Sequence, residues 1–426
     1  MSRSGSPVVA RACLWLLVVG TLAACSSSKH ETQVLAVPAD YPTIQAAVDA
    51  ADSGDVVLID PGTYNEAVVV STKGLIVRGT DRNAVVIDGG DEFENGVLVQ
   101  ADDVAVENLT IRRFTVNGLL FSKAYLDTGT GSSGEIPLLT GFRARYITAA
   151  NNGLYGIYAF NSTKGLIEHV YASGHPDSGV YVGQCKPCDT VVRDATAENN
   201  AIGYEGTNAS DKLFVIESRF VNNRIGMTPN TQRSERLAPQ GHAVIAANLV
   251  ADNNNPDAPA TKGGFGIGIA VGGGTANEVR DNHVTGNITV GIIVDNLEDF
   301  APSGNRVTAN VLENNGVDLS LGGFTSPPSD AAAAAGNCFS GNTFTTSVPR
   351  EIEALVPCDS DEDAAAESAP AAEITVAPAP PDIDYRDVPL PAEQPTMPAT
   401  ELSKYPAVGK PPAVVLDTLH VPTGSV

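Results

Sequence analysis

Aromatic and basic residues are scarce in this chain. Aromatic residues make up 6% of the 426 positions, and 26 Lys and Arg are set against 50 Asp and Glu. The resulting formal charge of −24 provides no basic face for a phosphate backbone, so nucleic acid is excluded as a partner. The frequent turn formers, 41 Gly and 28 Pro, favour an extracellular β protein instead.

The N-terminus carries one short apolar run, Ala12 to Ala24, after two arginines. A run of this length predicts a secretory signal (residues 1–24) rather than a membrane-spanning helix. It ends in Leu22-Ala23-Ala24-Cys25, which resembles the lipobox of bacterial lipoproteins. The resemblance implies that Cys25 is acylated, for example with palmitate, and that residues 25–35 form a tether. The alternative is an ordinary signal peptide with a chance cysteine.

The residue after Cys25 bears on localisation. Ser26 stands where an Asp would resemble an inner-membrane retention signal. We therefore expect a lipid anchor in the cell envelope, facing the periplasm or the exterior. The anchor lies in the outer membrane if the host is Gram-negative, and in the outer leaflet of the plasma membrane if it is Gram-positive.

Four further cysteines follow, and an oxidising compartment favours disulfides between them. We expect Cys338 to pair with Cys358. Cys185 and Cys188 are separated by Lys-Pro and followed by Asp, which does not fit haem attachment. A local disulfide is the main prediction for this pair, and metal binding is the alternative.

A glycine followed by alternating apolar residues recurs along the chain, and six of eight spacings between copies fall within 22 to 25 residues. A second alternating strand in each unit places one side in a core and the other in solvent. A leucine-rich repeat would need a Leu framework, which is absent. The pattern therefore predicts stacked coils of about 23 residues with parallel strands, interrupted by insertions after the two units that precede the long spacings. The copies begin at Gly96, Gly118, Gly156, Gly179, Gly203, Gly226, Gly268, Gly291 and Gly316.

Asparagine pairs close many units. Asn tolerates the left-handed conformation of a tight turn, and stacked copies can hydrogen-bond from coil to coil as a ladder. The pairs are Asn151-Asn152, Asn199-Asn200, Asn222-Asn223, Asn253-Asn254 and Asn314-Asn315.

The N-terminal end has a predicted cap, a short helix over Pro42 to Ala51 with apolar residues at helical spacing. The run from Thr43 to Tyr64 resembles the opening segment of right-handed β-helix proteins of the pectin lyase-like superfamily. The units at 151–315 resemble parallel β-helix repeats of carbohydrate-binding and sugar-hydrolase modules. The resemblance implies an all-β fold, a right-handed parallel β-helix over residues 36–345.

The last part of the chain differs in composition. From residue 359 it holds twelve prolines, twelve acidic residues and three basic ones. Such a segment cannot bury a core of its own, which predicts a mostly disordered tail over residues 346–426. Residues near Ala413 to Leu419 are a candidate site for a secreted protein partner.

The resemblance also bears on chemistry, because active members of the superfamily act on polysaccharides. Their signatures are absent: the Trp-x-Asp-His of pectate lyases, the paired aspartates of polygalacturonases and the methylesterase motifs. The Asp-Pro-His-type motif of alginate epimerases is only echoed by His175-Pro176-Asp177. Whether the protein is an enzyme is therefore open at this stage.

Polar residues nevertheless concentrate in the middle coils. Tyr158, Tyr181 and Glu205 each lie two residues after a repeat glycine, so stacking sets them in a row about 5 Å apart. Such a row suits a glycan chain along the coils, and the alternative is an ordinary solvated face. The candidate substrate-binding residues are Tyr158, Tyr181, Gln184, Glu205, Asn208, Asn230 and Arg233. The candidate catalytic residues are His175, Asp177, Glu205, Arg233 and His242, with a plain turn as the alternative for His175 and Asp177.

The insertion at 224–263 is the candidate wall or lid of this site. It contains or adjoins the one local basic cluster that the sequence suggests: Arg224, Arg233, Arg236 and Lys262. No metal site is predicted. Ca²⁺ is a candidate cofactor through Asp295 and Asp299, whose spacing matches no known Ca²⁺ loop.

Two functions follow from these features. The first is an envelope lipoprotein whose β-helix binds carbohydrate, without catalysis or with an undefined activity. The second is a polysaccharide-active enzyme of lyase or epimerase type acting on a uronate-containing glycan. The acidic chain repels a polyanion unless cations bridge the two, whereas a neutral glycan meets no such barrier. Envelope scaffolding is a third alternative.

Overall fold

The computed structural model describes residues 1–2, 5, 31–124, 137–260, 263–323, 336–358 and 374–423. Residues 32–426 form one compact unit, separate from residues 1–31. The predicted acylation at Cys25 lies outside the described residues. In the described part of the chain, no helix is both long and apolar enough to cross a membrane.

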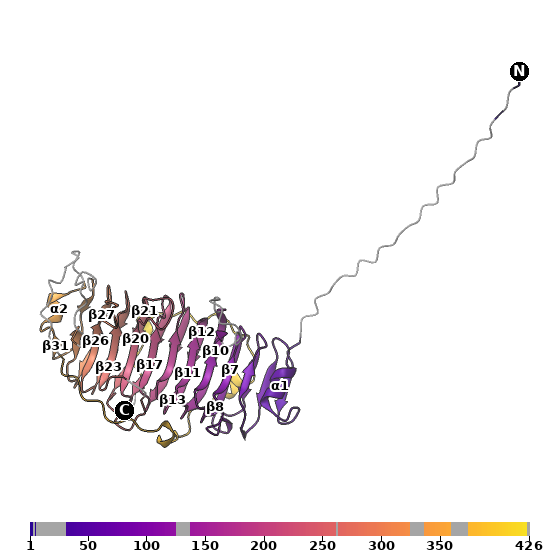
Figure 1. Cartoon of the computed structure of the whole chain (residues 1–426), viewed down its shortest axis with the longest axis horizontal. Helices are drawn as coiled ribbons and strands as arrows, with labels where there is room; N and C mark the ends of the chain where they lie inside the picture. Colours follow the sequence, from indigo (N-terminus) through magenta and orange to yellow (C-terminus); the bar gives the residue numbers. More distant parts are fainter. Residues whose placement is uncertain are drawn as a thin grey trace. The chain divides into compact units, whose positions relative to one another are not determined.

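The compact unit is a stack of coils whose strands pair in parallel with those of the next coil (Figure 1). The coil that starts at β11 (Tyr155–Phe160) shows the pattern. Its first strand joins an 11-stranded sheet, here called sheet B. Its next two, β12 (Ser162–Glu168) and β13 (Tyr171–Ser173), join a 20-stranded sheet, here called sheet A. This arrangement is a parallel β-helix, as the repeat predicted.

Sheet B also contains β4 (Val68–Val70), β7 (Asn95–Val99), β9 (Asn117–Phe121), β14 (Ser178–Gly183), β17 (Ile202–Thr207), β20 (Ile225–Asn230), β23 (Ile267–Gly272), β26 (Val290–Asp295), β29 (Leu319–Leu321) and β31 (Ser347–Val348). Sheet A also contains β1 (Val34–Val37), β2 (Val56–Ile59), β3 (Gly62–Tyr64), β5 (Ile76–Gly79), β6 (Val85–Asp88), β8 (Val104–Arg112), β10 (Leu139–Ala150), β15 (Thr190–Arg193), β16 (Thr196–Glu198), β18 (Leu213–Ile216), β19 (Arg219–Val221), β21 (Ala243–Ala246), β22 (Leu249–Ala251), β24 (Glu278–Arg280), β25 (His283–Thr285), β27 (Arg306–Thr308), β28 (Val311–Glu313) and β30 (Cys338–Ser340).

The repeat glycines lie where neighbouring coils approach most closely. A Cβ atom added at Gly226 would lie 2.5 Å from the carbonyl oxygen of Gly268, and one at Gly268 would lie 2.3 Å from that of Gly291. No other residue fits at such distances, because real Cβ contacts are longer. The spacing of these glycines in the sequence therefore gives the number of residues in each coil.

The asparagine ladder is present and runs inside the turn before sheet B. Asn200 donates to Asn223 at 3.0 Å, Asn223 to Asn253 at 3.1 Å, and Asn253 to Asn287 at 3.1 Å. The first asparagine of several pairs, such as Asn199 and Asn222, adopts positive φ as predicted. Each ladder amide satisfies main-chain groups that burial would otherwise leave unpaired.

Two further sequence predictions are confirmed. Helix α1 (Ile44–Ala50) buries Ile44, Ala47 and Val48 against the first coils, with Thr43 as its N-cap. The disulfides join Cys185 to Cys188 and Cys338 to Cys358. The second disulfide closes the last coils, next to helix α2 (Ile352–Leu355).

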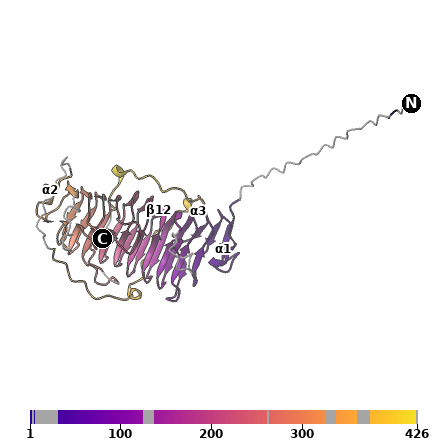
Figure 2. The same cartoon turned by 45° about the horizontal axis from the view of Figure 1, so that its top comes forward.

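The tail differs from the predicted disorder over most of its length. Residues 374–423 follow the outside of the coils (Figures 1 and 2), with short helical turns η3 (Tyr385–Asp387), α3 (Ala399–Leu402) and η4 (Leu416–Thr418). Arg82 and Asn151 donate to tail carbonyls at Pro395 and Val388, and Met397 is buried. The prediction of disorder considered only whether the tail could form a core of its own. The tail instead uses the β-helix surface as its partner.

Candidate functional site

The predicted row of residues is present on the outer face of sheet B. Tyr158 of β11 pairs in register with Tyr181 of β14, and Tyr181 pairs with Glu205 of β17. We call the group formed by Tyr155, Tyr158, Tyr181, Asp177, Glu205 and Glu235 the tyrosine–carboxyl site.

The three tyrosine rings contact one another. Tyr155 stacks on Tyr158 with ring centroids 4.3 Å apart, and Tyr181 meets the edge of Tyr158 at 4.8 Å. Phe160 extends the group, with its centroid 5.6 Å from that of Tyr158. Tyr155 and Tyr158 are half-buried, whereas Tyr181 is only 3% exposed. The rings therefore form a continuous aromatic surface beside the carboxyl groups.

Two carboxyl groups share a proton next to these rings. Glu205 and Asp177 are hydrogen-bonded to each other, and the Tyr155 hydroxyl is bonded to Asp177. The Ser178 hydroxyl lies 2.9 Å from Asp177 Oδ1 and 2.8 Å from Glu205 Oε2. Ser178, the first residue of β14, therefore hydrogen-bonds with both carboxyl groups and holds them in place.

The environment of Glu205 favours its neutral form. Burial first, and the charge of Asp177 second, raise the pKa of Glu205 to about 8. Burial also raises the pKa of Asp177, while hydrogen bonds from Glu205, Ser178 and Tyr155 oppose that rise. Glu205 therefore holds the proton and donates it to Asp177, and the two titrate as a coupled pair.

A second hydrogen-bond network fixes the other oxygen of Glu205. Thr207 donates to Oε1 at 3.0 Å, and Asn230 donates to it at 3.2 Å. Gln232 reaches the same oxygen at 3.5 Å. Asn230 thus contacts Glu205, and its predicted binding of substrate stays a prediction.

The third carboxyl group comes from the loop 231–240, which lies inside the predicted wall. Glu235 accepts a hydrogen bond from the Tyr181 hydroxyl, and burial raises its pKa to about 7. Asn208 holds this loop by donating to the carbonyls of Gln232 at 2.7 Å and Glu235 at 3.0 Å. Gln184 holds it through the Arg236 amide at 2.9 Å. Asn208 and Gln184 therefore position the loop, a role different from the predicted binding of substrate.

Arg233 lies outside this group. Its guanidinium pairs with Asp299 and Glu298, and its charge lies over the Phe300 ring at 5.6 Å. Of the predicted basic cluster, Arg224 donates to the carbonyl of Pro380 in the tail, and Lys262 lies outside the described residues.

The two candidate histidines also lie elsewhere. His175 is fully buried as one step of the asparagine ladder, with Nδ1 2.7 Å from Asn200 and Nε2 3.2 Å from Asn152. Burial lowers its pKa to about 4, so it stays neutral. His242 is exposed and immediately precedes β21 of sheet A. Neither side chain reaches the tyrosine–carboxyl site, which opposes the catalytic roles suggested for them.

Sequence reasoning missed Tyr155, Ser178, Thr207 and Glu235. Tyr155 and Ser178 could have been found, because they precede Tyr158 and Tyr181 by the same three positions in consecutive units. Glu235 could not, because it lies in an insertion whose path the repeat does not determine.

Metal ligands are not grouped in the part of the chain that the structure describes, where no cluster of three or more His, Cys, Asp or Glu could hold an ion. Asp299, one of the two candidate Ca²⁺ ligands, is paired with Arg233. Ca²⁺ thus remains a prediction.

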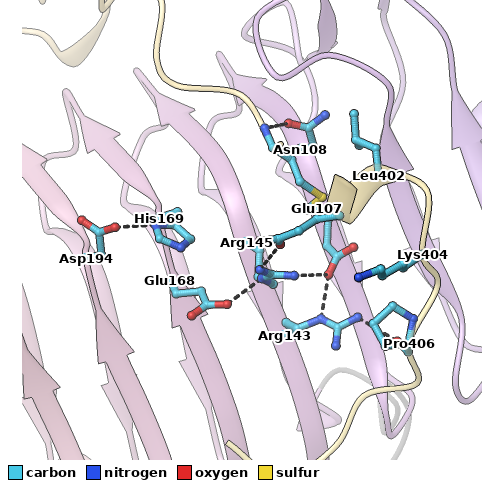
Figure 3. A network of polar contacts seen from close by, with 12 residues as sticks. Glu107, Asn108, Arg143, Arg145, Glu168, His169, Asp194, Leu402, Lys404 and Pro406 are labelled. Carbon is cyan, nitrogen blue, oxygen red and sulfur yellow. Dashed lines mark hydrogen bonds and ion pairs between the residues drawn. The ribbon is translucent and has the colours of Figure 1, made fainter. Parts of the chain in front are cut away.

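A second polar network lies on sheet A (Figure 3). Its members pair in register across five coils and alternate in charge, and we call them the arginine–glutamate ladder: Arg78, Glu107, Arg145, Glu168 and Arg193. Glu107 is fully buried and lies 2.5 Å from Arg78 and 2.6 Å from Arg143. Glu168 lies 2.6 Å from both Arg145 and Arg193.

The family described as "Right handed beta helix region" matches residues 129–312. The fold is a right-handed parallel β-helix. No curated protein sequence matches the chain.

Solved structures resemble the chain at low identity. The mannuronan C-5 epimerase AlgE4 A-module of Azotobacter vinelandii is 14% identical over 70% of this chain and 90% of its own, with a TM-score of 0.46. DFA-IIIase from Arthrobacter chlorophenolicus A6, without its lid, is 14% identical over 73% and 98%, with a TM-score of 0.48. Pectin methylesterase from Yersinia enterocolitica is 14% identical over 50% and 80%, with a TM-score of 0.36. At this level the likeness says nothing about activity or substrate.

Proposed function

We propose that the protein binds a neutral glycan along the outer face of sheet B, at the tyrosine–carboxyl site, as a lipid-anchored protein of the bacterial cell envelope. The observation that supports this most is the contact of three tyrosine rings with one another, beside carboxyl groups that pair with no Lys or Arg side chain among the described residues. Aromatic faces offer apolar area for sugar rings, and the neighbouring carboxyl and amide groups can bond sugar hydroxyls.

The charge of the site favours a neutral ligand. Within the described residues, Asp177, Glu205 and Glu235 accept hydrogen bonds only from hydroxyl, amide and carboxyl groups: those of Tyr155, Tyr181, Ser178, Thr207, Asn230, Gln232, the Gln184 backbone and the shared proton. A uronate would bring further negative charge to this place without a partner. Such a ligand would need a bridging cation such as Ca²⁺.

A second candidate function is proton transfer on the bound glycan, as in an enzyme of lyase or epimerase type. It is favoured by the raised pKa values of Glu205, about 8, and Glu235, about 7. An acid or base works best when its pKa lies near the working pH. This function would require the site to open, because Glu205 is 7% exposed.

Titration calorimetry with neutral and uronate glycans, each with and without Ca²⁺, tests the first proposal. We expect a neutral glycan to bind, and Tyr158→Ala to weaken binding roughly tenfold through lost ring contact. Tyr158→Phe keeps the ring and should retain most of the affinity. Tyr146→Ala is the control, because the Tyr146 ring stacks on His169 over sheet A. Binding of uronates alone, or equal losses in Tyr158→Ala and Tyr146→Ala, would contradict the proposal.

The same mixtures test the second candidate. An unsaturated product that absorbs in the ultraviolet marks a lyase, and a changed ratio of epimers marks an epimerase. Glu205→Gln should remove either product while glycan binding persists. Binding without product in the wild-type protein rules the second candidate out and leaves a binding protein.

A further inference from the structure

The tyrosine–carboxyl site continues into an apolar strip on the same face of sheet B. Ser178, which braces the carboxyl pair, is the first of five positions that pair in register from coil to coil. The next four positions carry aliphatic side chains, and parallel strand spacing makes the whole line roughly 19 Å long. In order, they are Ile202, Ile225, Ile267 and Val290.

The beginning of the tail covers this strip. Ile374 is 7% exposed and packs in one apolar cluster with Ile225, Ile267, Val290 and Ile293. This cluster is separate from the interior of the coils. Ile374 thus covers apolar side chains that lie beside a polar site, and apolar surface of this kind, when uncovered, marks a binding surface.

Four polar contacts hold this part of the tail, and most of them involve main-chain atoms. The Ile374 amide donates to the Gly323 carbonyl at 3.4 Å, and the Ala260 amide donates to Asp382 Oδ1 at 2.6 Å. The Ala377 amide donates to Thr289 Oγ1 at 3.1 Å, and Arg224 donates to the Pro380 carbonyl. Val376, in the same segment, is 48% exposed. The following part has anchors of its own, since Asn151 donates to the Tyr385 and Val388 carbonyls at 2.8 and 2.7 Å. Residues 374–382 can therefore leave the strip while the rest of the tail stays bound.

We propose that the strip is a set of additional glycan subsites, and that residues 374–382 occupy them until a long glycan displaces the segment. This inference rests on the proposed function and extends it along the coil axis. Short glycans then use the tyrosine–carboxyl site alone. Longer chains reach the strip only after they displace the segment. Their apparent affinity is therefore proportional to the fraction of molecules in which the strip is uncovered.

Binding of cellobiose, xylobiose and the corresponding hexasaccharides to the full chain tests this. We expect the wild-type protein to bind a disaccharide and its hexasaccharide with similar affinity. Ile374→Asp should release the segment and strengthen hexasaccharide binding about tenfold without changing disaccharide binding. The matched control is Val376→Asp, which adds the same charge to the same segment at an exposed position and should behave as the wild type. Equal hexasaccharide affinities in all three proteins would overturn the proposal.

A second measurement separates this proposal from the proposed function. Limited proteolysis of the full chain reports on whether residues 374–382 are covered, with no glycan present. Cleavage there should be faster in Ile374→Asp than in Val376→Asp. If it is, and no glycan binds to any of the proteins, the proposed function fails while the covering contact stands. Equal cleavage rates would show that Ile374 does not hold the segment, and the proposed subsites would fail even if disaccharides bind.

Discussion

The outer faces of the two sheets carry charge in opposite ways. On sheet A, each carboxylate of the arginine–glutamate ladder lies between guanidinium groups in register, and tail carbonyls take up further donors of Arg78 and Arg143 (Figure 3). On sheet B, three carboxyl groups lie together with tyrosines, and their pKa values are raised. The coils therefore have one face whose charges are paired and covered by the tail, and another, partly exposed face that carries carboxyl groups.

The two faces are therefore expected to have different roles, sheet A in stability and sheet B in function. Charges that are buried and fully paired on sheet A hold the coils and the tail together, and their removal leaves an uncompensated charge. Carboxyl groups whose pKa values are raised by burial reduce stability at neutral pH, so their presence calls for another benefit. The site on sheet B is for this reason the better candidate for ligand chemistry.

The largest expected effect is on sheet A. Glu107→Gln should leave Arg78 and Arg143 buried without a counter-charge and lower the free energy of unfolding by about 3–5 kcal/mol. Urea denaturation measures this. Glu313→Gln is the control, because Glu313 pairs with His283 at the surface and should cost at most about 1 kcal/mol. Similar losses in both variants would mean that the ladder is not the stabilising element.

The next effect is a pH dependence on sheet B. The pKa of Glu205 is raised to about 8 in the folded protein, so the folded state retains a proton that the unfolded state has released above about pH 5. Stability should therefore fall as pH rises towards 8, by up to about 1.4 kcal/mol per pH unit from this group. Glu205→Gln should remove that slope, as measured by urea denaturation across this range. Parallel pH profiles in the two proteins would show that Glu205 does not carry the buried proton.

A smaller effect is expected where the tail meets the coils. Met397 is 1% exposed, and its amide donates to Asn108 at 2.8 Å. Met397→Ala should cost about 2 kcal/mol, at the lower end for a buried methionine, because the site is at the surface of the β-helix. Leu390→Ala changes an exposed residue of the same tail and should cost little. Thermal unfolding of both distinguishes a docked tail from a loosely associated one.

The smallest effect concerns His175. His175→Asn places an asparagine in the ladder at the step between Asn152 and Asn200, so stability should change by less than about 1 kcal/mol. Glycan binding should not change either, because His175 does not reach the tyrosine–carboxyl site. A loss of binding without a loss of stability would restore the role that the sequence suggested for this histidine.

The features that the sequence predicted well are those that every coil repeats. Gly226 and Gly268 are required by close approach of neighbouring coils, and Asn223 by unpaired main-chain groups, so their spacing reveals the period. The row of Tyr158, Tyr181 and Glu205 follows from the same period. Register alone was enough to place these side chains on one face.

The features that could not be predicted depend on insertions and on distant partners. Glu107 and Arg145 align only after the insertion before β10 is placed, whereas Arg78 precedes Glu107 by 29 residues, so the three show no constant period in the sequence. Glu235 reaches Tyr181 through a loop held by Asn208, which no local pattern indicates. The packing of the tail on the coils could not be predicted from its own composition, because the side chains that bind it lie several hundred residues earlier.

The long distance in sequence between the tail and its partners affects the order in which the chain folds. A stack of coils can form progressively during synthesis, since each coil needs only its neighbour. The bond from Arg78 to the Lys404 carbonyl spans 326 residues and can form only after residue 404 has been synthesised. Before the tail is synthesised, the Arg82 guanidinium lacks its bond to the Pro395 carbonyl, and the apolar strip of sheet B lacks Ile374. A product terminated before residue 374 would therefore leave uncovered the groups on both faces that the tail contacts.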